Sequence, residues 1–224
     1  MDSILVDGKP IEEFRQKKYN YIFEYDKAQD TAPEISVESE YPVKILQATA
    51  VPGVAIIEVL SQDSEKVVSK YYINFNLAPN VGVPEDKVKR KVVSVDASAV
   101  PEAINTPQNT IDNDVTTKWA SQGNQWISYD LGGAKQVDSV AIYWLNGDQR
   151  ISPLQLQVSM DGKEWKTVYD GISSGKINGF ETYSFTPVNT RFVRILCFGN
   201  NMTTWNSIME VSILNEKAGE NHEE

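Results

Sequence analysis

The sequence has one cysteine, one histidine, no long hydrophobic run and no excess of basic residues. The single Cys197 excludes an internal disulfide, and its place in the apolar run 191–198 predicts a small buried side chain. The single His222 lies in the acidic C-terminal stretch, which leaves no histidine for nucleophilic or zinc chemistry in the folded body. No segment approaches the roughly 18 apolar residues of a membrane span, so membrane insertion is not expected.

Charge is the next constraint. The 224 residues include 21 basic and 31 acidic side chains, a net charge of −10. Binding to a nucleic acid backbone needs clustered Lys and Arg, so we exclude nucleic acid as a partner. The stretch 216–224 is rich in acidic residues and is expected to be a solvated, disordered tail. Residues 91–215 hold nine basic and twelve acidic residues, a balance that still permits an acidic ligand.

The pattern of hydrophobic residues predicts an all-β protein. Hydrophobic side chains make up 41% of the chain and fall in short runs rich in β-branched and aromatic residues, with weak helical periodicity. A small immunoglobulin-like sandwich is expected over 1–80 and a linker, with Pro, Gly and clustered charge, over 81–91. Residues 92–215 carry seven or so further short strands, which favours a second sandwich or jelly roll.

Several blocks of the second part resemble a known family. They are TIDNDVTTKW (110–119), WISYDLG (126–132), VSMDGKEW (158–165), RFVRI (191–195) and MEVSI (209–213). In this order they are similar to the coagulation factor 5/8 type C (discoidin) domain. GDQR (147–150) and GNNMTTWNSI (199–208) resemble the family 32 carbohydrate-binding modules attached to bacterial alginate and polysaccharide lyases. The resemblance implies a jelly-roll β-sandwich with sugar-binding loops at one end.

The residues before 81 resemble, on shorter blocks, the immunoglobulin-like modules of secreted bacterial glycosidases. That resemblance rests on 4–14, 51–59 and 71–75, and it implies a spacer. The alternating aromatic residues of 19–25 fit the core face of a strand better than a platform for ligand.

Oxygen-bearing residues gather in the first of the family blocks. A calcium ion takes six to eight oxygens from carboxylates, carbonyls and hydroxyls. The resemblance implies a structural Ca²⁺ site on Asn109, Asp112, Asp114, Thr117 and Glu210, the last from a distant strand. The alternative is an Asx-rich turn without metal, since Asp and Asn also bond their own backbone in turns.

Three polar segments are expected to bind sugar, because saccharides pack on aromatic rings and bond planar amides, carboxylates and guanidinium groups. The candidate contacts are Arg150, Gln149, Asp148, Asn200, Asn201, Trp205, Asn206, Gln122 and Asn124. Arg150 points to an acidic ligand, because a guanidinium pairs with a carboxylate such as that of a uronate polymer. The alternative is an ion pair between Arg150 and Asp148.

The five tryptophans divide between core and site. Trp119, Trp126 and Trp165 occupy strand positions of the family and are expected in the core. Trp144 ends a strand beside the Gly147 loop, and both a core position and a ligand contact are considered for it. Trp205 either stacks on the sugar or packs under its loop. Ala120 stands where many galactose-binding relatives have a histidine, which weakens a galactose assignment.

The sequence therefore predicts a non-catalytic accessory region of an exported bacterial polysaccharide-degrading enzyme. It would be monomeric, covalently part of that enzyme and located outside the cell, in the periplasm or on the cell surface. Binding an oligo- or polysaccharide would act by raising the local substrate concentration. The alternatives are an adhesion module for a protein or a lipid headgroup, and a purely structural unit, because one fold serves many functions.

Overall fold

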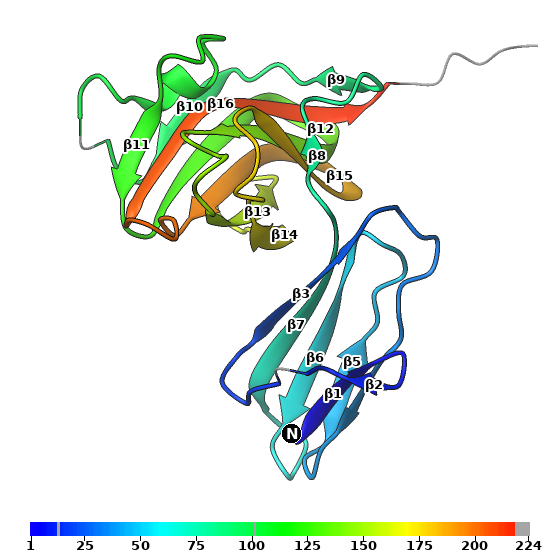
Figure 1. Ribbon diagram of the computed structural model, residues 1–224. Coiled ribbons are helices and arrows are strands. Elements are labelled where there is room, and N and C mark those ends of the chain that lie inside the picture. Colours follow the sequence, from blue (N-terminus) through cyan, green and yellow to red (C-terminus); the bar gives the residue numbers. More distant parts are fainter. Residues whose placement is uncertain (13, 101, 218–224) are drawn as a thin grey trace, which may run out of the picture. The chain divides into compact units, whose positions relative to one another are not determined.

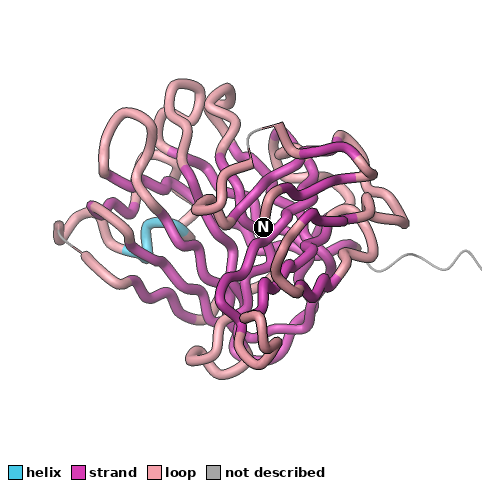
Figure 2. Tube along the Cα trace, turned by 90° about the horizontal axis from the view of Figure 1, so that it is seen from below, coloured by secondary structure: helices cyan, strands magenta, loops and turns pink. Residues whose placement is uncertain are grey.

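The computed structural model describes residues 1–12, 14–100 and 102–217, and the chain divides into two compact units between Ala78 and Pro79. Both units are built from strands and loops (Figure 1). The described residues contain one short helix, the 3-10 helix η1 (Pro107–Thr110), which is drawn in cyan in Figure 2. None of the helical structure described is long and apolar enough to cross a membrane. The all-β class predicted from the sequence is confirmed.

The first unit is a sandwich of two sheets. One sheet has the order β2-β1-β4 and the other β3-β7-β6-β5, in which β3 and β7 run parallel. Its strands are β1 (Ser3–Val6), β2 (Lys9–Pro10), β3 (Asn20–Tyr25), β4 (Ile35–Glu38), β5 (Val43–Leu46), β6 (Gly53–Leu60) and β7 (Val67–Leu77). Alternate residues such as Ile57, Ile73 and Phe75 are fully buried between the sheets. The aromatic residues Tyr21 and Phe23 also pack in or against this core, as their spacing predicted.

The second unit contains the longer strands. They are β8 (Asn80–Val81), β9 (Lys87–Lys89), β10 (Ser94–Ala97), β11 (Trp119–Gln122), β12 (Gln125–Trp144), β13 (Pro153–Ser159), β14 (Lys166–Ile172), β15 (Phe180–Cys197) and β16 (Trp205–Glu216). Both β12 and β15 pass through register shifts, one between Asp130 and Lys135. The first half of β12 pairs with β10 and the second half with β16. Such bends let one strand serve both layers of a sandwich.

The core of the second unit lies between these layers. Along β12, Ile127, Tyr129 and Leu131 point inward and are at most 3% exposed. Trp144 is also buried, and its indole N–H donates to the Tyr183 hydroxyl at 2.9 Å. A fully buried side chain of this size contributes about 1.5–3 kcal/mol relative to an exposed one. Trp144 is therefore a core residue.

The segment expected as a linker is paired with the second unit. β8 pairs with β15, and β9 pairs with β16. Lys87 also forms an ion pair of 3.0 Å with Asp138, in which both side chains are largely buried. Composition alone suggested an exposed linker because the charged residues here alternate with few apolar ones, yet backbone pairing at a sheet edge needs no apolar side chains. The expected tail 216–224 lies, beyond residue 217, outside the described residues.

Candidate functional site

The acidic loop, which we define as residues 109–117, is shaped by its own side chains. The Asp114 backbone N–H donates to Asp112 Oδ1 at 2.8 Å, and Asp114 Oδ1 accepts from the Thr116 N–H and hydroxyl at 2.9 and 2.6 Å. The Asn109 amide donates to the carbonyls of Ile104 and Lys118. These bonds engage Asp114 Oδ1 and the amide nitrogen of Asn109. Asp114 Oδ2 makes no hydrogen bond to another described residue, so this carboxylate keeps one side-chain oxygen in addition to the backbone carbonyl.

Oxygens from these turns converge on the hydroxyl of Thr117. Its Oγ1 lies 2.8 Å from Asp112 Oδ2, 3.1 Å from the Asp114 carbonyl and 3.4 Å from the Asn109 carbonyl. A hydroxyl has one hydrogen and can satisfy only one of three acceptors. The chemistry of this set, all oxygen with two carboxylates nearby, suits a hard cation.

Glu210 reaches the acidic loop from β16. The residue is 2% exposed, and its carboxylate accepts the backbone N–H of Asn113, whose φ of 64° turns that N–H toward β16. Burial raises the pKa of Glu210, and the neighbouring Asp112 adds to the rise, against the opposing effects of the Asn113 N–H and Lys89. Within the described residues no group of three or more His, Cys, Asp or Glu is placed to hold a metal ion. The carboxylates of Asp112 and Glu210 face each other here.

Arg150 lies in a second group of loops. The loop 145–152 turns at Asn146, whose carbonyl accepts the N–H groups of Gln149 and Arg150 at 2.9 and 3.0 Å. Gly147 is required there, because a Cβ would lie 2.5 Å from the Ile177 carbonyl. The Arg150 side chain is half-buried, and no hydrogen bond or ion pair joins it to another described residue. The alternative ion pair with Asp148 is not formed, and both Asp148 and Gln149 are exposed.

Asn201 joins the loop 199–206 to the loop 145–152, which contains Arg150; we call these two loops the Arg150 loops. The Asn201 backbone N–H donates to the Ile151 carbonyl, and the Ile151 N–H donates to Asn201 Oδ1, both at 2.9 Å. Asn200 braces its own loop, because it accepts from Met202 and Thr203 N–H and donates to the Trp205 carbonyl. Asn201 thus brings two predicted segments side by side.

Asn206 is not available to a ligand. It is 3% exposed, its Oδ1 accepts the Gly199 N–H, and its Nδ2 donates to the Ser121 and Gly123 carbonyls at 3.2 and 2.8 Å. The prediction that Asn206 contacts sugar is replaced by a structural role. The amide looked like a binding group in sequence because two of its three partners, Ser121 and Gly123, are more than 80 residues away.

The segment 121–125 is the third polar segment expected to bind sugar, and hydrogen bonds join it to the loop 199–206. Gln122 pairs with Trp205 across β11 and β16, and its amide donates to Thr204 Oγ1 at 2.9 Å. Asn124 is exposed. Trp205 is half-buried and comes after the exposed Met202 and Thr204 in the chain. Eight of the nine predicted sugar contacts are therefore half-buried or exposed, on three segments that adjoin through hydrogen bonds.

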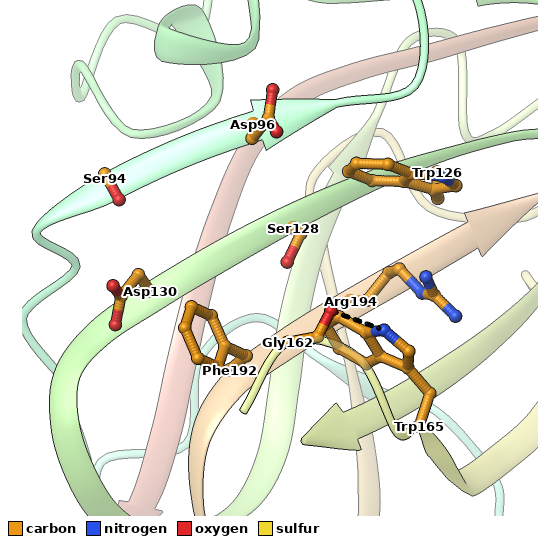
Figure 3. A pocket seen from close by; sticks show the side chains of 9 residues that line it. All are labelled: Ser94, Asp96, Trp126, Ser128, Asp130, Gly162, Trp165, Phe192 and Arg194. Atoms are coloured by element: carbon orange, nitrogen blue, oxygen red, sulfur yellow. Dashed lines mark hydrogen bonds between the residues drawn. The ribbon is translucent and has the colours of Figure 1, made fainter. Parts of the chain in front are cut away.

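Two of the tryptophans expected in the core are on the surface instead. Trp119 is fully buried, whereas Trp126 and Trp165 are half-buried and line a hollow on the outer face of the sheet with Arg194 (Figure 3). The alternation of β12 carried the signal, because Trp126 is out of phase with the inward Ile127 and Tyr129. Trp165 follows the Asp161–Gly162 turn and closes over it with a 3.2 Å bond to the Gly162 carbonyl.

The geometry of the second unit agrees with comparisons to known proteins. The pattern of the F5/8 type C domain matches residues 94–211. A structure described as "CBM32 of AlyQ in complex with 4,5-unsaturated mannuronic acid" is 44% identical with a TM-score of 0.54, over 56% of this chain and 97% of that one. No curated protein matches the chain.

Two further structures place the module among binding and catalytic neighbours. "Truncated AlyQ with CBM32 and alginate lyase domains" is 42% identical with a TM-score of 0.57, over 59% of this chain and 34% of that one. A pectin-binding carbohydrate-binding module is 29% identical with a TM-score of 0.54, over 58% of this chain and 94% of that one. The matched family model spans more than half of the 224 residues, and the chain belongs to the F5/8 type C domain family, with a second unit of the carbohydrate-binding module type.

Proposed function

We propose that the second unit binds a uronate-bearing glycan at the loops 145–152 and 199–206, with Arg150 pairing with the uronate carboxylate. The observation that carries this proposal is the Arg150 side chain, which lies in a braced loop and has no hydrogen-bond or ion-pair partner among the described residues. Its guanidinium is therefore available to a ligand carboxylate, with which it can form two parallel hydrogen bonds.

The neighbouring groups fit the remainder of a sugar ring. Trp205 offers an aromatic edge or face, and the exposed Gln149 and Asn201 offer amide donors and acceptors. The similar AlyQ module was solved with 4,5-unsaturated mannuronic acid, which supports an acidic sugar of this class. Since AlyQ also carries alginate lyase domains, we propose that this chain likewise works as a binding accessory of an exported polysaccharide-degrading enzyme.

We further propose that the acidic loop holds a structural Ca²⁺. Asp112 and Glu210 would supply carboxylate oxygens, Asn109 and Asp114 backbone carbonyls, and Thr117 its hydroxyl. The support is the convergence of these oxygens and the two facing carboxylates. The ion would supply positive charge that holds the loop 109–117 against β16, and it would take no part in sugar contact.

Calorimetric titration with oligomannuronate tests the uronate site. We expect Arg150→Ala to weaken binding by 10- to 100-fold, because a charge-assisted bond contributes about 1.5–3 kcal/mol. Arg150→Lys keeps the charge but loses the paired donors and should fall between, and Trp205→Ala should weaken binding less. Lys135→Ala, which removes one exposed cation on β12, is the matched control and should bind as wild type. Equal affinities of the wild type and Arg150→Ala would refute the assignment.

A further inference from the structure

A second groove lies on the outer face of the sheet formed by β10, β12, β15 and β13 (Figure 3). Pairing across the strands places Asp96 beside Ser128 and Ser128 beside Arg194, and Phe192 lies beside Asp130. The hollow has a volume of about 180 Å³, with the turn at Gly162 as its far rim. Pockets that enclose a drug-sized molecule measure roughly 300–1,000 Å³. A ligand would therefore lie along this face rather than be enclosed by it.

Two tryptophans and an arginine form the wall of the groove. The Arg194 guanidinium carbon lies 4.0 Å from the centre of the Trp165 ring and 5.7 Å from that of Trp126. Arg194 also donates twice to Gln157 Oε1, at 3.0 and 2.6 Å. These contacts fix the aromatic rings before any ligand arrives, which lowers the entropy cost of binding. Such rings offer apolar surface to the C–H face of a sugar.

The charges of the groove balance internally. Asp130 is paired with Arg191 through two bonds of 2.9 and 2.8 Å. Arg194 carries the other positive charge, and Asp96 the other negative one, with one oxygen accepting from the Ala97 N–H at 2.9 Å. The second oxygen of Asp96 and the hydroxyls of Ser94 and Ser128 make no hydrogen bond to other described residues. These free groups accept from or donate to hydroxyls, and the free carboxylate oxygen repels a polyanion.

We propose that this groove is a second glycan site, separate from the Arg150 loops, and that it takes a chain of neutral pyranose sugars. Trp126, Ser128 and Asp130 are spaced two residues apart on β12, so they span about 13 Å along the strand. A chain of linked sugars matches a row of one aromatic ring followed by two hydroxyl-binding groups at this spacing. This proposal does not depend on the proposed uronate site. The two sites would differ in the charge of their ligands, with an acidic sugar at Arg150 and neutral sugars in the groove.

A proline-rich peptide is the rival occupant, because such peptides dock in grooves lined by aromatic residues. Its apolar rings would cover Ser94, Asp96 and Ser128 and leave these polar groups without partners, which is costly. The polar floor of the groove therefore favours a hydroxylated ligand.

Amide chemical-shift mapping with cellohexaose, mannohexaose and xylohexaose tests the proposal. At least one of these neutral hexasaccharides should shift the amides of 94–96, 126–130 and 192–194, in the wild type and in Arg150→Ala alike. Trp126→Ala should weaken that binding at least tenfold and leave oligomannuronate affinity unchanged. Asp96→Ala, at an exposed position, should weaken it several-fold and provides a variant that does not disturb packing.

Three results with the hexasaccharides would overturn the second site. They are the absence of shifts in the groove with all three hexasaccharides, shifts confined to 145–152 and 199–206, and equal affinities of the wild type, Trp126→Ala and Asp96→Ala. Binding of a decaproline peptide to the groove in place of the hexasaccharides would likewise overturn it. If Arg150→Ala loses oligomannuronate binding and still binds the neutral hexasaccharides, the two sites are independent, and the second site is supported.

Discussion

The acidic loop and the Arg150 loops treat their polar side chains in opposite ways. In the acidic loop, acceptor oxygens converge and the bonds within the loop leave two carboxylates, Asp112 and Glu210, facing each other. In the loops 145–152 and 199–206, amides satisfy the backbone and leave a cation, Arg150, without a partner among the described residues. The first arrangement favours a positively charged ligand, and the second favours a negatively charged one.

Residue type is a weaker guide to ligand binding than the hydrogen bonds that a side chain already makes within the protein. Asn200 and Asn206 have the chemistry of sugar-binding residues, yet their amides hold the loop together. Arg150 is distinguished because no described group satisfies it. A group that the fold leaves unsatisfied at a partly open position is therefore the better indicator of ligand chemistry.

Removal of calcium should lower the stability of the second unit more than any of the substitutions below. A ligand that binds only the folded state stabilises it by about 4 kcal/mol at a thousandfold excess over its Kd. We therefore expect scanning calorimetry to show the second unit melting on the order of 10 °C lower in EGTA than in saturating Ca²⁺. Glu210→Gln should lose most of the difference, because it removes a carboxylate.

The first unit supplies a control for this experiment. Glu58→Gln breaks an ion pair of 2.7 Å with Lys70 and should leave the response to Ca²⁺ unchanged. Identical melting of the second unit with Ca²⁺ and with EGTA would show that the acidic loop is an Asx-rich turn and no metal site.

The next effect tests the brace beneath the Arg150 loops. Asn206→Ala leaves the Gly199 N–H and the Ser121 and Gly123 carbonyls without their partner in a buried setting. Each unsatisfied buried group costs about 1–3 kcal/mol, so we expect a loss of about 3 kcal/mol in the free energy of unfolding by urea. The exposed Asn124→Ala should change that free energy by less than about 0.5 kcal/mol. Equal losses in the two variants would contradict the structural role of Asn206.

The fold could be predicted from the sequence because strands and turns are indicated by residues that are close together in the chain. The alternation of Ile127, Tyr129 and Leu131, together with the Asp161–Gly162 turn, is enough to indicate half-buried strands and hairpins. The pairing of β9 with β16 was missed because a short charged edge strand has no such pattern.

The site was predicted less completely because its distinctions are not local. Whether Asn206 faces a ligand or the protein depends on Ser121 and Gly123, which come from another strand connection. The outward position of Trp126 was visible in the alternation of β12, but the likeness to family strand positions outweighed it. Partners distant in sequence thus decide which polar residues stay free.

Asn201 joins the loops 145–152 and 199–206 through two hydrogen bonds with Ile151. Asn201→Ala removes one exposed hydrogen bond and should cost about 1 kcal/mol of stability. Oligomannuronate affinity should nevertheless fall several-fold in titration calorimetry, because the variant frees Ile151, the neighbour of Arg150, and also removes the Asn201 amide from the site. Met202→Ala, at the adjacent exposed position, is the matched control and should keep both stability and affinity. If Asn201→Ala binds as tightly as Met202→Ala, the Arg150 loop holds its position without this brace, and the unsatisfied guanidinium alone determines binding.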